Sequence, residues 1–294
     1  MRPAGALASL IILLAPVHAP AAPITFSTAL PVGEGKFINR EQLVFTRSGD
    51  DPGNNGLVVD VDALVSVLAY GASEKLALFA TLPYLKKELR QSGGVRRSSK
   101  GLGDLTIFGR YTLFQRDGIG RTLRLGAIAG IKAPTGDDDE TDALGRLPIP
   151  LQSGTGSWDS FIGVVASSET LRGGFHSQLT YQAKTAANNF EAGDVSRLDL
   201  SWQRRVWPRA LQPSSNAFLY GVLEANIIHS RKSTVSGQVN DNSGGTTIFI
   251  TPGIQYASKK LILEAAVQIP VYQDLNGTAL ENDYVLRAGF RVNY

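Results

Sequence analysis

The sequence has no cysteine, a single methionine and only three tryptophans among its 294 residues. Without cysteine it can form neither a disulfide nor a thiolate metal site, and it has no cysteine nucleophile. Its 29 basic and 26 acidic residues leave a formal net charge of +3, which gives no electrostatic case for binding nucleic acid. A mean hydropathy of −0.03 excludes a polytopic helical membrane protein, and 43% hydrophobic residues argue against disorder.

The N-terminal residues have the features of a secretory signal peptide. Met1-Arg2 supplies a short positive region, and residues 6–15 form an apolar run. Small residues fit the cleavage pattern up to Ala21, so we expect processing there or one residue later. The apolar run is shorter than the roughly 20 residues that span a bilayer. We therefore predict a cleaved signal peptide over 1–21 and a single exported domain over 22–294.

The rest of the chain alternates between apolar and polar residues with a period of two, which predicts β-strands. In the segment 59–69, valines and alanines at odd positions oppose Asp60 and Asp62. The 31 glycines indicate many turns and little helix. We expect about twelve strands, the first near 37–46 and the last at 284–294, each long enough to cross a membrane at a tilt.

Alternation alone is also found in soluble β-sandwiches, and the lengths of the connections distinguish the two folds. Long loops at one end and short turns at the other are typical of an outer-membrane barrel. The sequence therefore predicts an all-β fold, a transmembrane antiparallel up-and-down β-barrel of about 12 strands, with short periplasmic turns and long extracellular loops, in the bacterial outer membrane. The predicted long loops are 47–56, 90–103, 133–157, 184–194, 231–244 and 273–282, and the short turns are 71–74, 115–121, 168–173 and 257–260.

The last predicted strand carries a candidate assembly signal. Gly289, Val292 and Tyr294 are spaced as a glycine, an apolar residue and a terminal aromatic residue. This spacing is similar to the terminal signal that the outer-membrane barrel assembly machinery reads, so we expect that machinery as a partner. Aromatic residues near the ends of other strands fit the girdles found at membrane interfaces.

Four further motifs are distinctive: LPVGEG at 30–35, GLGDL at 101–105, KAPTGD at 132–137 and GTGSWD at 154–159. The final strand at 286–294 belongs with them. With these motifs the chain resembles the outer-membrane proteins of the MetA-pathway-of-phenol-degradation family, described as transporters. The resemblance implies an antiparallel barrel and the passage of small aromatic or hydrophobic compounds, and it provides no catalytic residues.

Polar residues opposite the apolar face of each strand are expected to line the lumen. Their signs are mixed, so they could brace the wall as ion pairs or line an open polar channel, and no strong ion selectivity follows. We expect a narrow pore, because the strand number lies between that of filled barrels and that of wide channels. Either the 133–157 loop or the segment before Phe37 could constrict it. The candidate pore residues are Asp60, Asp62, Arg110, Arg124, Lys132, Arg197, Asp199, Glu224, Glu264, Arg287 and Arg291.

The mature chain offers His176 and His229 as candidates for catalysis. A barrel hydrolase would need one of them beside a serine and a carboxylate or amide. We interpret both as ordinary lumen or rim residues, and we expect neither enzyme activity nor a cofactor. The acidic run at 137–140 lacks the spaced ligands of a calcium loop, so we expect no metal site. That run and the basic cluster at 96–100 are interpreted as solvated loops that could contact lipopolysaccharide.

Together these features favour an outer-membrane channel or transporter-like barrel for passive passage of small solutes, aromatic or hydrophobic compounds among them. The alternative is an outer-membrane barrel enzyme acting on lipid or ester, or a non-conducting structural barrel. An enzyme would bring a histidine beside a serine, whereas a channel would have an unplugged lumen. The expected partners are outer-membrane lipid and lipopolysaccharide, the assembly machinery and a small-molecule solute whose identity the sequence leaves open; nucleic acid is not expected.

Overall fold

The computed structural model describes residues 21–212 and 215–294. The predicted signal peptide lies, apart from Ala21, outside the described residues. Among the residues that are described, no helix is long and apolar enough to cross a membrane. The single helical turn within them is η1 (Ile149–Leu151).

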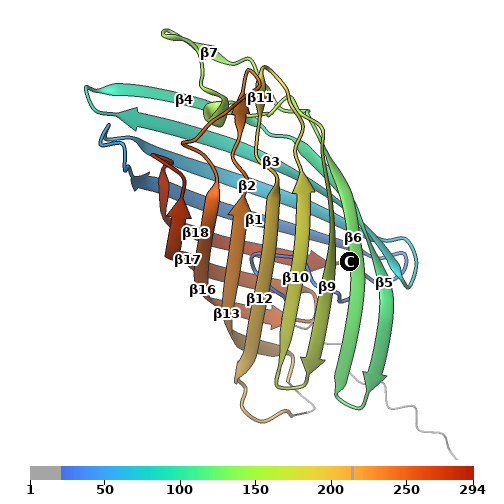
Figure 1. Ribbon diagram of the computed structural model, residues 1–294. Helices are drawn as coiled ribbons and strands as arrows, with labels where there is room; N and C mark the ends of the chain where they lie inside the picture. The colour runs from blue at the N-terminus through green and yellow to red at the C-terminus, as the bar shows by residue number, and fades with distance from the viewer. Residues whose placement is uncertain (1–20, 213–214) are drawn as a thin grey trace, which may run out of the picture.

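Twelve antiparallel strands form a closed barrel, as predicted (Figure 1). The barrel closes because β1 pairs with both β2 and β18. Thirteen strands are named below, but β4 and β5 count as one strand of the barrel. They lie on the same side of β3, where β4 pairs with one half of β3 and β5 with the other half. The wall consists of β1 (Phe37–Asp50), β2 (Val58–Gly71), β3 (Leu76–Gln91), β4 (Val95–Leu102), β5 (Leu105–Gly118), β6 (Arg121–Ala133), β9 (Asp159–Thr170), β10 (Gly173–Ala183), β12 (Val195–Trp207), β13 (Ala217–Ser230), β16 (Gly245–Ser258), β17 (Leu261–Leu275) and β18 (Glu281–Asn293).

The two ends of the barrel differ in their connections. At one end, which we call the short-turn end, turns such as 119–120, 171–172 and 259–260 join consecutive strands. The opposite, long-loop end carries the segments that connect β6 to β9, β10 to β12 and β13 to β16. Short strand pairs lie within these segments: β7 (Thr141–Asp142), β8 (Gly145–Arg146), β11 (Phe190–Glu191), β14 (Thr234–Val235) and β15 (Gln238–Val239).

One predicted loop is mostly strand. The segment 90–103 forms the tip of a hairpin in which the second half of β3 pairs with β4, and this hairpin reaches beyond the neighbouring wall in Figure 1. Its residues include Arg96, Arg97 and Lys100. Both faces of a hairpin outside the membrane can be polar, so alternation of polarity could not indicate this strand.

Side chains of the wall alternate between an apolar outer face and a polar inner face. On the outer face Leu68 is 49% exposed and Ile107 is 48% exposed, whereas the inward-facing Asp199 and Gln255 are fully buried. This arrangement is the reverse of a soluble protein and suits a wall that faces lipid. The interior of the barrel is therefore mainly a polar, hydrogen-bonded core.

Residues 21–34, which we call the plug, precede β1 and run inside the barrel (Figure 1). Ile24 and Ala29 within the plug are each 1% exposed. The chain leaves the lumen at the short-turn end, where Glu34 forms a β-bridge with Gly71. A side chain at Gly71 would collide with the carbonyl of Gly33, so this crossing requires glycine. Of the two predicted constrictions, the structure thus places the segment before Phe37 within the lumen.

Candidate functional site

The plug crosses the lumen from β16 to β5 and is held by side chains of the wall. The amide of Ala22 donates to Oε1 of Gln255 at 3.0 Å, and its carbonyl accepts from Nε2 of the same side chain at 2.9 Å. On the other side, the amide of Ala29 donates to Oγ of Ser167 at 2.9 Å. The plug therefore meets its backbone hydrogen-bonding needs through side chains that are far away in the sequence.

Glu224 on β13 is the main acidic anchor of the plug. Its carboxylate accepts the amide of Ile24 at 2.7 Å, the amide of Thr25 at 3.1 Å and the hydroxyl of Thr25 at 2.5 Å. Glu224 is only 1% exposed. Burying a carboxylate is costly unless donors surround it, and the plug supplies these donors. The charge of Glu224 and the position of the plug thus depend on each other.

Three inward-facing arginines bind carbonyl groups of the plug. Arg40 donates to the carbonyl of Ile24 at 2.6 Å and, through Nε, to Glu264 at 2.8 Å. Arg110 donates to the carbonyls of Thr28 and Leu30. Arg197 donates to the carbonyl of Thr25 at 3.4 Å and to Asp199 at 2.7 Å. Guanidinium groups suit this task, because each presents several donors in a fixed plane.

The other predicted pore residues that face inward lie around this level or nearer the ends. Arg287 donates to Gln268 at 2.7 Å and to Gln42 at 3.0 Å. Arg124 lies near the short-turn end, where it bonds to side chains of its own hairpin. Lys132 lies near the long-loop end, and Arg291 borders a cavity described below. The mixed charges thus form a network around the plug. This differs from both alternatives in the sequence analysis, which were ion pairs within the wall and an open polar channel.

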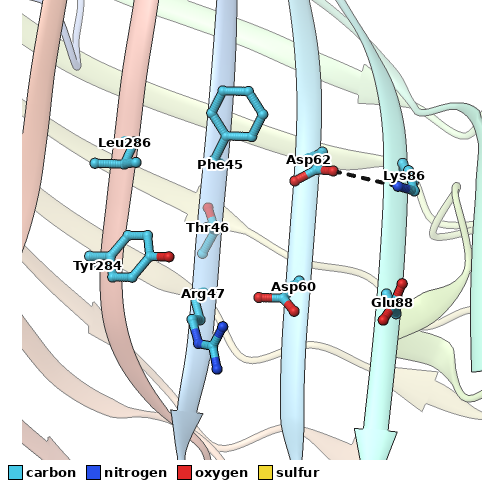
Figure 2. A pocket seen from close by; sticks show the side chains of 9 residues that line it. All are labelled: Phe45, Thr46, Arg47, Asp60, Asp62, Lys86, Glu88, Tyr284 and Leu286. Atoms are coloured by element: carbon cyan, nitrogen blue, oxygen red, sulfur yellow. Dashed lines mark ion pairs between the residues drawn. The ribbon is translucent and has the colours of Figure 1, made fainter. Parts of the chain in front are cut away.

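Asp60 and Asp62 do not line the lumen, and the prediction for these two residues was wrong. The register sets Asp60 opposite Arg47 and Asp62 opposite Phe45, and directly paired side chains share a face. Phe45 is 40% exposed on the apolar outer face. Figure 2 shows both aspartates on this face, around a shallow pocket of about 380 Å³. The dashed line marks the contact between Asp62 and Lys86 at 3.9 Å.

The physical reason for this error is that both faces of β2 are apolar near the short-turn end. Leu64 and Leu68 share the outer face with the two aspartates. Ala69 faces inward, where it packs with Val32 of the plug and Ala77 of β3. Because an apolar part of the plug requires an apolar inner wall, the polarity of alternate residues in β2 does not distinguish the inside from the outside.

Three of the family-like motifs meet at the long-loop end. Asp104 accepts the amides of Gly136 and Thr155 at 3.1 and 3.0 Å. Lys132 lies 3.2 Å from Asp104 and 2.8 Å from Asp159. A side chain at Gly154 would collide with the backbone of Gly136, which explains a glycine there. These motifs therefore fasten the 134–158 loop to the ends of β5, β6 and β9.

Further contacts hold the same loop against β4. Arg97 donates to both oxygens of Asp142 at 2.8 Å, and this hydrogen bonding lowers the pKa of Asp142 below its ordinary value of 3.8. Asp138, from the acidic run, accepts from Asn188 of the next loop at 2.8 Å. Within the described residues no group of three or more acidic, histidine or cysteine side chains could hold a metal ion.

A cavity of about 570 Å³ lies between the plug and the wall formed by β1–β3, β5, β17 and β18. It reaches the short-turn end, because Lys259 of the β16–β17 turn and Tyr294 border it. Farther inside, the rings of Phe79 and Phe108 stack with centroids 4.5 Å apart. The lumen is thus neither filled nor open: the plug occupies one part and this cavity the other.

A serine, a histidine and a glutamate also meet in the wall. Oγ of Ser167 lies 2.8 Å from Nδ1 of His176, and Nε2 of the same ring lies 2.8 Å from Oε1 of Glu169. Ser167 is 1% exposed and His176 is fully buried. Ser167 already accepts the amide of Ala29, and none of the three borders the cavity. His229, by contrast, is exposed and contacts Thr246.

Comparison with known proteins relates the whole barrel to outer-membrane proteins. Residues 42–279 match the model of the family described as “Putative MetA-pathway of phenol degradation”, whereas no curated protein matches the chain. The COG4313 outer membrane channel from Pseudomonas putida F1 is similar with a TM-score of 0.69 at 14% identity, over 93% of this chain and 100% of that one. The beta domain of the Bordetella autotransporter BrkA gives 0.47 at 15% identity, over 89% and 100%, and LpxR from Salmonella typhimurium gives 0.41 at 9%, over 88% and 99%. The first of these likenesses shows the fold, a closed barrel of the outer-membrane type.

Proposed function

Because the chain belongs to the family described as “Putative MetA-pathway of phenol degradation” and folds as a closed barrel, we propose that it is a channel of the bacterial outer membrane for passive passage of small solutes. Its long loops would face the exterior and its short turns the periplasm. The similar solved barrel from Pseudomonas putida is itself described as a channel.

The observation that carries this proposal is the combination of the plug and the cavity beside it. The cavity of about 570 Å³ is of the size that binds small molecules. Many contacts of the plug are hydrogen bonds to polar side chains, such as those of Gln255 and Glu224, and water can replace such bonds when the plug moves. A displacement of the plug would therefore widen the path while the wall stays intact.

A cross-link tests whether the plug controls passage. Nδ2 of Asn226 lies 2.8 Å from Oγ1 of Thr25, and the chain has no cysteine of its own. In the double variant Thr25→Cys/Asn226→Cys, a short thiol-to-thiol cross-linker should abolish the conductance measured in planar bilayers. The pair Arg47→Cys/Asp60→Cys, opposite each other on the outer face, is the matched control and should conduct after cross-linking.

Two results would contradict the proposal. Wild-type protein that is correctly folded and silent in bilayers would exclude a channel. Equal conductance of the plug variant before and after cross-linking would show that solutes pass without movement of the plug.

Hydrolysis of a lipid or ester is a second candidate function, favoured only by the meeting of Ser167, His176 and Glu169. The buried serine oxygen and its bond to Ala29 leave no approach for an ester, so we propose that the cluster anchors the plug and that the protein is not an enzyme. Labelling of Ser167 by a fluorophosphonate, absent in Ser167→Ala, would reverse this assignment.

The proposed partners are the barrel assembly machinery, lipopolysaccharide and a small-molecule solute. Of the proposed assembly signal, Gly289 and Val292 lie on β18 and Tyr294 lies just beyond it. Tyr294 is 68% exposed. Deletion of Tyr294 should therefore strongly reduce the amount of barrel in the outer membrane, whereas undiminished assembly would exclude this role. The charged outer face around Asp60 and Lys86 could bind lipopolysaccharide through bridging cations.

A further inference from the structure

We propose that the cavity beside the plug is a binding site for an aromatic carboxylate, and that the channel therefore favours small aromatic anions. The inference rests on the proposed function, because it names the class of solute that this cavity would receive. It rests on three features of the lining: the sign of its charge, the lack of carboxylate partners for two of its arginines, and the position of its aromatic rings.

The cavity is lined by charge of one sign. Lys36, Arg40, Arg110, Lys259 and Arg291 border it, and no aspartate or glutamate side chain of the described residues does. Elsewhere on the inner wall carboxylates lie beside cations, as Asp199 does beside Arg197. The lumen as a whole is mixed in charge, as the sequence indicates, but the tertiary structure gathers cations around one compartment. Such a compartment attracts anions and repels cations.

The arginines of the cavity differ in their hydrogen-bond and ion-pair partners. Arg40 has a carboxylate partner in Glu264 at 2.8 Å. Arg110 donates only to neutral oxygen atoms of the plug and has no carboxylate partner. The side chain of Arg291 makes no hydrogen bond or ion pair with any described residue, although it borders the cavity. An unpaired guanidinium in a confined space favours an incoming anion.

The planar fork of donors on Arg291 matches the two oxygens of a carboxylate. The guanidinium of Arg291 forms no ion pair with any described carboxylate, so the position of the anionic group is free for a solute.

The inner part of the cavity suits a flat ring. The rings of Phe79 and Phe108 lie parallel, 1° apart in orientation, and the guanidinium of Arg110 lies 5.0 Å from the centroid of Phe79. Val67 and Ala69 add apolar surface. Aromatic pairs gain energy beyond the area that they bury, so an aromatic ring gains more here than an aliphatic chain. The carboxylate would lie toward Arg291, which is opposite Arg40 in the register of β18 and β1.

Ligand binding tests this site without the need for conduction. We would measure ¹⁹F NMR binding of 4-fluorobenzoate and of the neutral 4-fluorobenzyl alcohol to the purified full barrel in detergent. The acid should bind about tenfold or more tightly than the alcohol, because only the acid can form charged hydrogen bonds. Hexanoate, which carries the same charge without a ring, should compete poorly.

Variants then locate the site. Arg291→Gln should weaken binding of 4-fluorobenzoate by about 10- to 100-fold, and Phe108→Leu should reduce the preference for 4-fluorobenzoate over hexanoate. Arg47→Gln, on the outer face, is the matched control and should bind as the wild type does. Each variant is first checked for heat-modifiable mobility on gels, so that a loss of binding is not a loss of folding.

Equal affinity for the acid and the alcohol, or unchanged binding by a folded Arg291→Gln variant, would overturn the inference. The proposed function fails separately, because silence of the wild type in bilayers leaves the binding result unaffected. Binding that is lost in Arg291→Gln while the wild type conducts would support both.

Discussion

At the scale of single residues, the inner wall uses charge to hold a segment of backbone. Glu224 receives three donors from Ile24 and Thr25, and Arg40 and Arg110 bind carbonyls of the same segment. These groups are fully or nearly buried, so an unpaired one would be costly. The plug is therefore specified by a few side chains rather than by a continuous interface.

Glu224→Ala should loosen the plug without opening the barrel. The variant leaves the buried amide of Ile24 and the part-buried amide and hydroxyl of Thr25 without their acceptor. The cost is about 1–3 kcal/mol for a buried unsatisfied group. We expect faster hydrogen exchange of residues 22–30 and a higher bilayer conductance than in the wild type. Glu88→Ala, on the outer face, should leave both measurements unchanged. Unaltered exchange in Glu224→Ala would mean that other contacts suffice to hold the plug.

A second residue-scale prediction concerns pH at the long-loop end. The pKa of Asp142 is lowered by hydrogen bonding to Arg97, and a carboxyl group with a lowered pKa stabilises the folded loop above its unfolded pKa, near 3.8. This stabilisation is lost as the pH falls through the lower, folded value. The protection of the 134–158 amides, relative to the intrinsic exchange rate at each pH, should therefore fall below about pH 3.8 in the wild type. Arg97→Gln should already show the faster exchange at pH 6, and a loop insensitive to both changes would exclude the pair as its anchor.

At the scale of elements, each strand separates lipid from lumen by the direction of alternate side chains. In β6, Leu125 is 39% exposed on the outer face, and in β5 Thr106 faces inward opposite Lys132. The same alternation fails as a guide in β2, where the plug makes the inner face apolar. Alternation in the sequence therefore identifies the lipid-facing side of a strand only where the inner side packs against polar groups.

Arginine substitutions test the assignment of faces. Leu125→Arg should destabilise the barrel by about 2–4 kcal/mol if the position lies near the middle of the bilayer. Thr106→Arg should be tolerated, because its side chain enters the polar lumen. Gln178, although it also faces inward, is unsuitable as a control because it accepts the amide of Ser27. Urea unfolding in lipid vesicles gives the comparison, and equal losses from both variants would show that the faces are wrongly assigned.

At the scale of the whole molecule, closure of the wall determines stability and also the space inside. β1 and β18 complete the ring, so the wall strands pair in a continuous cycle. The exception is β4, which pairs with β3 alone. The plug and the 134–158 loop are attached to this ring mainly by side chains. Apart from the bridge between Glu34 and Gly71, neither takes part in its hydrogen-bonded ladder. They can therefore rearrange at a lower cost than the wall.

The closed ring should resist detergent. Refolded protein should migrate differently on SDS gels before and after boiling, because the ring is closed by the pairing of β1 with β18. A variant that lacks residues 22–34 should keep this behaviour, since the plug contributes no strand to the wall. Identical mobility of heated and unheated wild type would count against a closed barrel, and its loss only in the shortened variant would make the plug essential for folding.

The sequence by itself determined the fold class, because alternation and turn length are local properties of the chain. In strands such as 123–131 the alternation of apolar and polar residues identifies the lipid-facing side. The difference in length between the 134–158 loop and the 119–120 turn is likewise evident without knowledge of tertiary contacts. Most of the inward-facing charges, such as Arg110 and Glu224, could be named for the same reason. The final strand and the family resemblance added to this, and the family is now established by the match over 42–279.

Only the tertiary structure decided what occupies the lumen. The plug has no periodic pattern, because its partners Gln255 and Glu224 lie 200 or more residues away. The outward position of Asp60 and the contact between Ser167 and His176 likewise depend on neighbours across strands. Closure of the barrel brings Arg110 and Arg291 to one cavity without a carboxylate, although each lies among mixed charges in its own part of the sequence. Local periodicity in the sequence determines the strands of the barrel wall. What occupies the lumen depends on contacts between distant residues, which form only when the barrel closes.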